Sequence, residues 1–78
     1  MTRVTLYTRA GCHLCEEARE VVRRVCDATG TGWVERDLDR VPELLARYAT
    51  LVPVVLVDGK EHAHWRVDPA RLTEALRR

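Results

Sequence analysis

The chain has 78 residues, 46% of them hydrophobic, and 13 Lys and Arg against 12 Asp and Glu leave a net charge of +1. This length predicts one domain spanning residues 1–78, because chains divide into several domains only at greater lengths. A balanced charge disfavours a nucleic-acid partner, which would select a basic surface. No apolar run approaches the roughly 18 residues of a membrane span, and the N-terminus lacks a secretory signal, so we expect no membrane partner and a cytoplasmic location.

The first half of the chain predicts two strands around one helix. Hydrophobicity alternates over residues 3–8, as in a half-buried strand. Apolar side chains then recur at 3.6-residue spacing over residues 13–29, which is typical of an amphipathic helix, and residues 30–32 (GTG) end it. Residues 33–37 predict a short second strand.

The second half predicts a short helix, a hairpin and a last helix. Pro42 favours a helix start within residues 39–43. Residues 53–57 (PVVLV) read as a strand that is covered on both faces, and Asp58-Gly59 is a two-residue hairpin turn that returns residues 60–66 antiparallel beside it. Asp68 and Pro69 are the cap and the first residue of the last helix.

The order of these elements is β-α-β-α-β-β-α. A βαβ unit requires two parallel strands, and a hairpin adds its strands antiparallel. The sequence therefore predicts an α/β fold with a four-stranded mixed sheet sandwiched by three helices.

The clearest chemical signal is the Cys-x-x-Cys pair at the junction of the first strand and the first helix. Cys12 falls at the helix N-cap and Cys15 at the third helical position, so their α-carbons lie about 5–6 Å apart, within reach of a disulfide. The unpaired N–H groups of the helix start favour a thiolate on Cys12, which becomes the nucleophile. Cys15, one turn inside, would resolve the mixed disulfide.

Other interpretations of the cysteines stay open. The pair can be buried small hydrophobes, a site in a non-catalytic interaction domain, or ligands of an iron–sulfur cluster shared between two chains. A zinc site within one chain is disfavoured, because one Cys-x-x-Cys gives two ligands and His62 and His64 lack the usual spacing. Cys26 lies about 16 Å along the helix from Cys15, so it is a packing residue or a regulatory thiol and not a disulfide partner.

Three motifs in one order, residues 6–15 (LYTRAGCHLC), Val52-Pro53 and Asp58-Gly59, resemble the glutaredoxin branch of the thioredoxin superfamily. The likeness is to small bacterial glutaredoxin-like proteins with a Cys-His-Leu-Cys site. It implies a thioredoxin-like fold and a thiol-disulfide oxidoreductase that reduces protein or low-molecular-weight disulfides without a bound cofactor. It also implies a cis Val52–Pro53 bond beside the nucleophile, with the Val52 backbone free to pair with an extended peptide or with glutathione.

The resemblance assigns further residues to substrate binding. Arg9 matches the basic residue that glutaredoxins use on the glutathione carboxylate, and His13 replaces the usual Pro and would tune the thiolate; alternatively, both are ordinary solvated side chains. Residues 63–68 (AHWRVD) depart from the family's Gly-Gly-Cys-Asp-like segment, so Trp65 either adds bulk where glutathione binds or packs in the core. The implied electron donor is therefore either glutathione or a thioredoxin-reductase-type flavoprotein.

Overall fold

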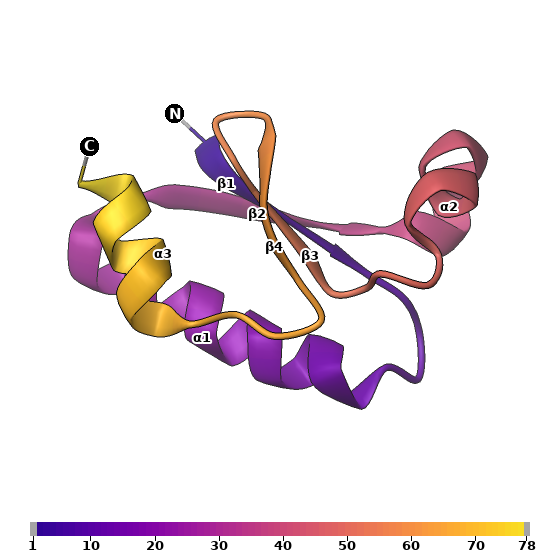
Figure 1. Cartoon of the computed structure of the whole chain (residues 1–78), viewed down its shortest axis with the longest axis horizontal. Helices are drawn as coiled ribbons and strands as arrows, with labels where there is room; N and C mark the ends of the chain where they lie inside the picture. Colours follow the sequence, from indigo (N-terminus) through magenta and orange to yellow (C-terminus); the bar gives the residue numbers. More distant parts are fainter. Residues whose placement is uncertain (1, 78) are drawn as a thin grey trace.

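The computed structural model describes residues 2–77 and has one four-stranded mixed sheet with helices packed on it (Figure 1). The strands are β1 (Thr2–Thr8), β2 (Gly32–Asp37), β3 (Val54–Val57) and β4 (Lys60–His64), and the helices are α1 (His13–Thr29), α2 (Pro42–Tyr48) and α3 (Pro69–Leu76). The strand order is β2-β1-β3-β4, with β1 parallel to β2 and antiparallel to β3, and β3 antiparallel to β4. The predicted α/β class, element order and mixed sheet are confirmed.

The alternation along the strands builds a core on each face of the sheet. On one face, side chains of β1 and β3 pack with α1 and α3 in a cluster that includes Val4, Leu6, Ala18, Val22, Val55 and Leu72. On the other face, Tyr7, Leu38, Tyr48, Val54 and Leu56 form a second cluster around α2. Figure 1 shows α1 and α3 together on one side of the sheet and α2 apart from them. The helices thus sandwich the sheet as the sequence predicts.

The first three strands differ from the prediction by one residue at their starts, and two larger differences have local reasons. The returning strand ends at His64 rather than at residue 66, because Trp65 has a φ of +65°, a left-handed conformation that breaks an extended strand. A separate 3₁₀ turn, Leu38–Arg40, precedes α2, and the helix proper begins at Pro42. Val41 between them has a φ of −130° and a ψ of 85°, outside the helical region that the residue before a proline avoids.

The strand register collects four chain segments at one end of the sheet. Thr8, the last residue of β1, pairs with Asp37 at the end of β2. Val54 at the start of β3 pairs with Tyr7 on one side and with His64 at the end of β4 on the other. The four segments that project from this end are residues 9–12, 38–40, 52–53 and 64–66. Among residues 2–77, no helix is both long and apolar enough to cross a bilayer.

Candidate active site

Cys12 caps the start of α1. The preceding Gly11 has a φ of +75°, a left-handed conformation that suits glycine and turns the chain from β1 into the helix. Cys12 is extended, with φ of −93°, and its Sγ accepts a hydrogen bond of 3.2 Å from the backbone N–H of Cys15. Cys12 is half-buried, in contrast to the two other cysteines, and a helix N–H points at its sulfur. Such a donor stabilises negative charge on sulfur.

Cys15 has a different environment. Its side chain is 1% exposed, and all three cysteines are free thiols. Burial raises the pKa of the Cys15 thiol to about 12, and its hydrogen bond to Cys12 acts in the same direction. A hydrogen bond from the backbone of Arg9 and the charge of Arg19 oppose this rise. The outer cysteine is therefore open to a partner, whereas the inner one is enclosed and held as a thiol.

The loop before β3 presents a free stretch of backbone at the same end of the sheet. The Val52–Pro53 peptide bond is cis, as the resemblance implies, and Pro53 is buried. Among residues 2–77, the N–H and C=O of Val52 make no backbone hydrogen bond. Because unpaired backbone groups readily add an extended chain, Val52 offers a donor and an acceptor to a peptide.

Trp65 is hydrogen-bonded to that loop through its backbone and its indole ring. Its backbone N–H donates to the Pro53 carbonyl at 2.8 Å, and its indole Nε1–H donates to the Thr50 carbonyl at 2.9 Å. The side chain is nevertheless 51% exposed. The interpretation of Trp65 as a core residue is wrong, because its hydrogen bonds hold the ring over the loop at residues 50–53 instead of under α3. About half of a large aromatic residue is therefore exposed next to the loop that contains Val52.

The segment that follows Trp65 reaches the first helix. Arg66 Nη1 lies 3.9 Å from Glu17 Oε2 on α1. The His64 ring meets the Trp65 ring edge-on at a centroid distance of 4.8 Å. These contacts place residues 64–66 along one side of the site, with Arg66 at the start of α1.

Arg9 and His13, the remaining two residues singled out in the sequence, flank Cys12 along the chain. Arg9 donates from Nε to Asp39 Oδ1 at 3.0 Å, so its guanidinium already has a carboxylate partner. His13 is exposed at the first position of α1. A role of Arg9 on the glutathione carboxylate, or of His13 in tuning Cys12, stays a prediction.

Sequence reasoning missed a polar cluster behind the cysteines. Arg19 on α1 makes two hydrogen bonds to Glu35 on β2, and Thr8 donates to the same carboxylate at 2.9 Å. The pKa of Glu35 is lowered, chiefly by the hydrogen bond from Arg19. Arg19 lies four residues after Cys15 on one helix face, a spacing visible in the sequence, but its partner on another element was not.

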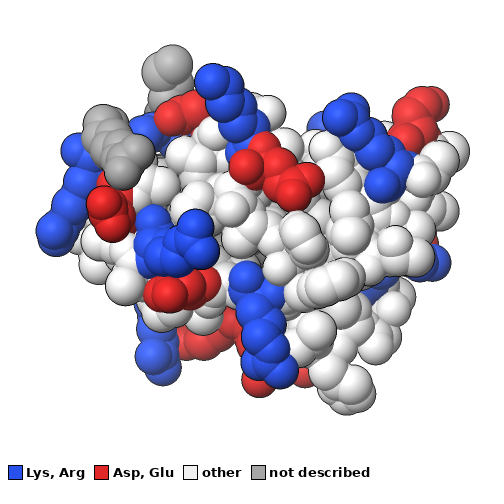
Figure 2. All heavy atoms as spheres, in the orientation of Figure 1, with Lys and Arg blue, Asp and Glu red and all other residues white. Residues whose placement is uncertain are grey.

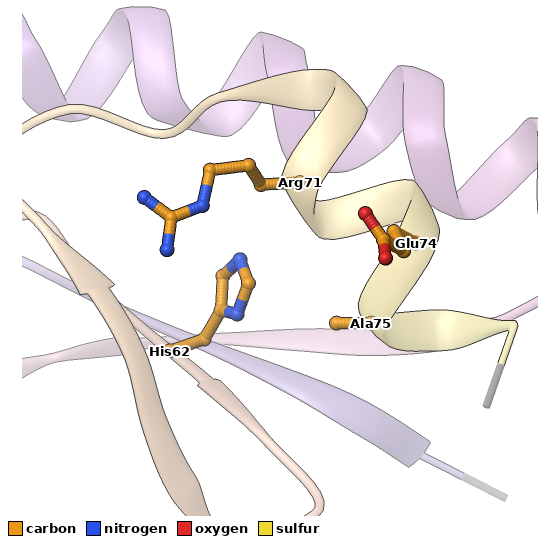
Figure 3. A pocket seen from close by; sticks show the side chains of 4 residues that line it. All are labelled: His62, Arg71, Glu74 and Ala75. Atoms are coloured by element: carbon orange, nitrogen blue, oxygen red, sulfur yellow. The ribbon is translucent and has the colours of Figure 1, made fainter.

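The other features of the chain lie outside this site. A hollow between β4 and α3 is lined by His62, Arg71, Glu74 and Ala75 and contains none of the expected site residues (Figure 3). Burial, with the nearby Arg71 charge, lowers the pKa of His62. Cys26 is 1% exposed in the core on α1, as expected of a packing residue, and burial raises its pKa. Within residues 2–77, no group of three or more His, Cys, Asp or Glu is placed to hold a metal ion.

Comparison with known proteins identifies the class. The fold is that of thioredoxin: a mutant thioredoxin from Halobacterium salinarum superposes with a TM-score of 0.65 at 21% identity, over 92% of this chain and 68% of that one. The family model described as glutaredoxin-like domain (DUF836) matches residues 3–77. The chain belongs to this glutaredoxin-like family of the thioredoxin superfamily.

Two relatives are similar over nearly the whole chain. Rv0508 of Mycobacterium tuberculosis, described as uncharacterized, is 36% identical over 97% of this chain and 84% of its own length. The X-ray structure of the protein XcR50 from X. campestris has a TM-score of 0.77 at 31% identity, covering 95% of each chain. The fold and the family together support a redox-type role in general terms.

Proposed function

We propose that this protein is a thiol-disulfide oxidoreductase in which Cys12 attacks a disulfide and Cys15 releases the product. The observation that carries the proposal is the contrast between the two sulfurs. Cys12 is partly open to solvent and accepts the Cys15 N–H, whereas Cys15 lies enclosed one turn further along α1. A disulfide that meets Cys12 forms a mixed disulfide there, and only then does Cys15 attack Cys12 and expel the reduced product.

The surroundings of Cys12 support a protein or peptide substrate. Val52 offers an unpaired N–H and C=O, and the exposed indole of Trp65 adds an apolar surface beside it. Figure 2 shows that charges of both signs cover the part of the surface near α3, whereas the surface at the lower right of the view, near the start of α1, is mostly uncharged. An extended segment with apolar residues around its cystine fits these features better than a charged ligand does.

Glutathione fits the same place less well, and we therefore favour a thioredoxin-reductase-type flavoprotein as the electron donor. Trp65 occupies the rim of the loop at residues 50–53, and Arg9 is paired with Asp39 rather than free for a carboxylate. Reduction of the Cys12–Cys15 disulfide by glutathione and by such a reductase, measured side by side, separates the two donors. Rapid glutathionylation of Cys12 would contradict this preference, and rapid reduction by the flavoprotein would support it.

The proposed function is tested with single-cysteine replacements. Cys12→Ser abolishes reduction of an insulin disulfide, and Cys15→Ser accumulates a mixed disulfide on Cys12 that intact-mass measurement detects. Cys26→Ala is the matched control and retains full activity, because Cys26 is buried away from the site. Purified protein that carries iron or zinc lost on Cys15→Ser, with no mixed disulfide, would favour a metal-binding module instead.

A further inference from the structure

Of the three arginines in the middle of α1, two bond within the helix and one bonds to the sheet. Arg23 and Arg24 both bond to Glu20 on the same helix, as charged neighbours three and four residues apart commonly do. Arg19 instead reaches across to the sheet, where Nε lies 2.6 Å from Glu35 Oε1 and Nη2 lies 2.8 Å from Glu35 Oε2. This two-point contact fixes the plane of the Arg19 guanidinium.

Arg19 lies about one helical turn after the inner cysteine. Arg19 follows Cys15 by four residues, so both side chains lie on the same face of α1. Thr8, at the end of β1, donates to Glu35 Oε2 at 2.9 Å. This bond orients the Glu35 carboxylate, which in turn orients the Arg19 guanidinium. The charge is thus oriented from two strands as well as from its own helix.

Several groups act on the Cys15 sulfur. Burial raises the pKa of Cys15 most, and the hydrogen bond to Cys12 and the negative charge of Cys12 raise it further. A backbone hydrogen bond from Arg9, in the segment after β1, and the Arg19 guanidinium lower it. The carboxylates of Glu35, on β2, and of Glu16, on α1, raise the pKa of Arg19 and so favour its charged form.

The balance of effects on the Cys15 pKa changes when Cys12 forms a mixed disulfide with a substrate. In a mixed disulfide the Cys12 sulfur carries no negative charge, so its contributions against the Cys15 thiolate disappear. Burial still opposes ionisation of Cys15, and the Arg9 hydrogen bond and the Arg19 charge still favour it. The Arg19 guanidinium therefore assists the resolving cysteine once Cys12 is in the mixed disulfide, because the attacking species is the thiolate.

We propose that Arg19, held by Glu35, is a positioning residue of the resolving step that stabilises the Cys15 thiolate as it attacks the mixed disulfide on Cys12. In this step the bond between Cys12 and the substrate sulfur breaks and the Cys12–Cys15 bond forms. The Cys15 sulfur is oxidised, the substrate sulfur is reduced, and the proton lost by Cys15 ends on the departing thiol. The proposal rests on the proposed function, because it assigns a role within that reaction.

The test separates the two chemical steps with dithiobis(nitrobenzoate), which releases one thionitrobenzoate when Cys12 attacks and another when Cys15 resolves. All variants carry Cys26→Ala, and the reagent is stoichiometric. We expect Arg19→Gln to slow the second release about tenfold at neutral pH and to move its pH profile up by about one unit, as loss of a nearby opposite charge does. The first release changes less than twofold.

Three further variants distinguish an effect of the Arg19 charge from a purely structural role of the Arg19–Glu35 ion pair. Arg23→Gln, one turn along α1, leaves both releases unchanged. Arg19→Lys keeps the charge and retains most of the second-step rate. Glu35→Gln removes the carboxylate of the Arg19–Glu35 ion pair but leaves the Arg19 guanidinium. It therefore does not move the pH profile of the second release upward.

Equal slowing of the second release by Arg19→Gln and Glu35→Gln would overturn the proposal, as would an unchanged second release in Arg19→Gln. Should Arg19→Gln fail to fold by circular dichroism, Arg19→Lys decides: a second release slowed with an unshifted pH profile overturns the proposal, and a retained rate supports it. A wild-type protein that shows no second release contradicts the proposed function itself, and so the two failures are distinguishable.

Discussion

At one end of the sheet the polar groups bond to one another, whereas at the end that carries Cys12 several of them stay open. Where β1 begins, Arg3 donates from Nε and Nη2 to the Asp58 carboxylate at 3.0 and 2.9 Å and from Nη1 to the Leu76 carbonyl at 3.0 Å. The N–H of Asp58 returns a bond of 2.8 Å to the Arg3 carbonyl. One side chain thus joins β1, the β3–β4 turn and the end of α3.

The cysteine end has the opposite character. The Val52 backbone groups lack a backbone partner among residues 2–77, the Trp65 side chain is half exposed, and Cys12 is accessible. Backbone groups without a protein partner and an exposed aromatic ring are available to a ligand. The bonds that join β1, the β3–β4 turn and α3 thus lie at the opposite end of the sheet from the groups proposed to act on substrate, and we expect substitutions of the two sets to have separable effects.

The largest expected effect on stability comes from the core that α3 completes. Leu72→Ala removes a side chain that is 0% exposed in the cluster between α3, α1 and the sheet. It lowers the free energy of unfolding by about 2–4 kcal/mol, measured by urea denaturation. Leu72→Met, which conserves volume, costs less than about 1.5 kcal/mol. Disulfide exchange by the folded fraction stays unchanged, and a change in its rate constant would break the separation of the two ends.

Trp65→Ala, in contrast to Leu72→Ala, is expected to change activity more than stability. It lowers kcat/KM for reduction of insulin about tenfold, because a large exposed aromatic contact is lost, while the reaction of Cys12 with dithiobis(nitrobenzoate) is unaffected. Trp65→Phe keeps an aromatic ring and recovers part of the activity. Val34→Ala removes the other large exposed hydrophobic side chain, on β2, and is the matched control with no effect. An insulin rate that does not respond to Trp65→Ala contradicts a substrate surface there.

A smaller effect is expected at Glu35, beside the cysteine end. The hydrogen bond from Arg19 lowers the Glu35 pKa below its ordinary value of 4.5. A depressed folded-state pKa means that the stabilisation is fully present above pH 4.5 and is lost as the pH falls through the lower folded value. The melting temperatures of wild type and Glu35→Gln therefore differ at pH 7 and converge in acid. A difference that does not shrink as the pH falls below 4.5 is inconsistent with this ion pair as its source.

The smallest effect is expected at Asp58, where both partners are exposed at the far end. The hydrogen bond from Arg3 lowers the Asp58 pKa below 3.8, so its contribution is present above that pH and disappears as the pH falls further. Asp58→Asn slightly lowers the melting temperature at pH 7, in a salt-dependent way, and leaves disulfide exchange unchanged. A loss of exchange activity in Asp58→Asn would show that the two ends are coupled.

The sequence alone was sufficient for the elements and their order. Hydrophobic spacing over residues 13–29 and the turn at Asp58-Gly59 are local signals, and a helix cap such as Cys12 depends only on its immediate neighbours. The parallel pairing of β1 and β2 followed from the βαβ order. The cis bond at Pro53 was indicated by the family resemblance rather than by spacing.

Only the tertiary structure decided which side chains act together. Arg9 meets Asp39 30 residues away, Arg19 meets Glu35 16 residues away, and the Trp65 indole bonds to the Thr50 carbonyl instead of entering the core. These contacts depend on strand register and on the direction of each side chain across elements, which periodicity along one element does not encode. The sequence by itself therefore determined where the two sulfurs sit on the first helix, and the packing of helix on sheet determined which charge reaches the inner one.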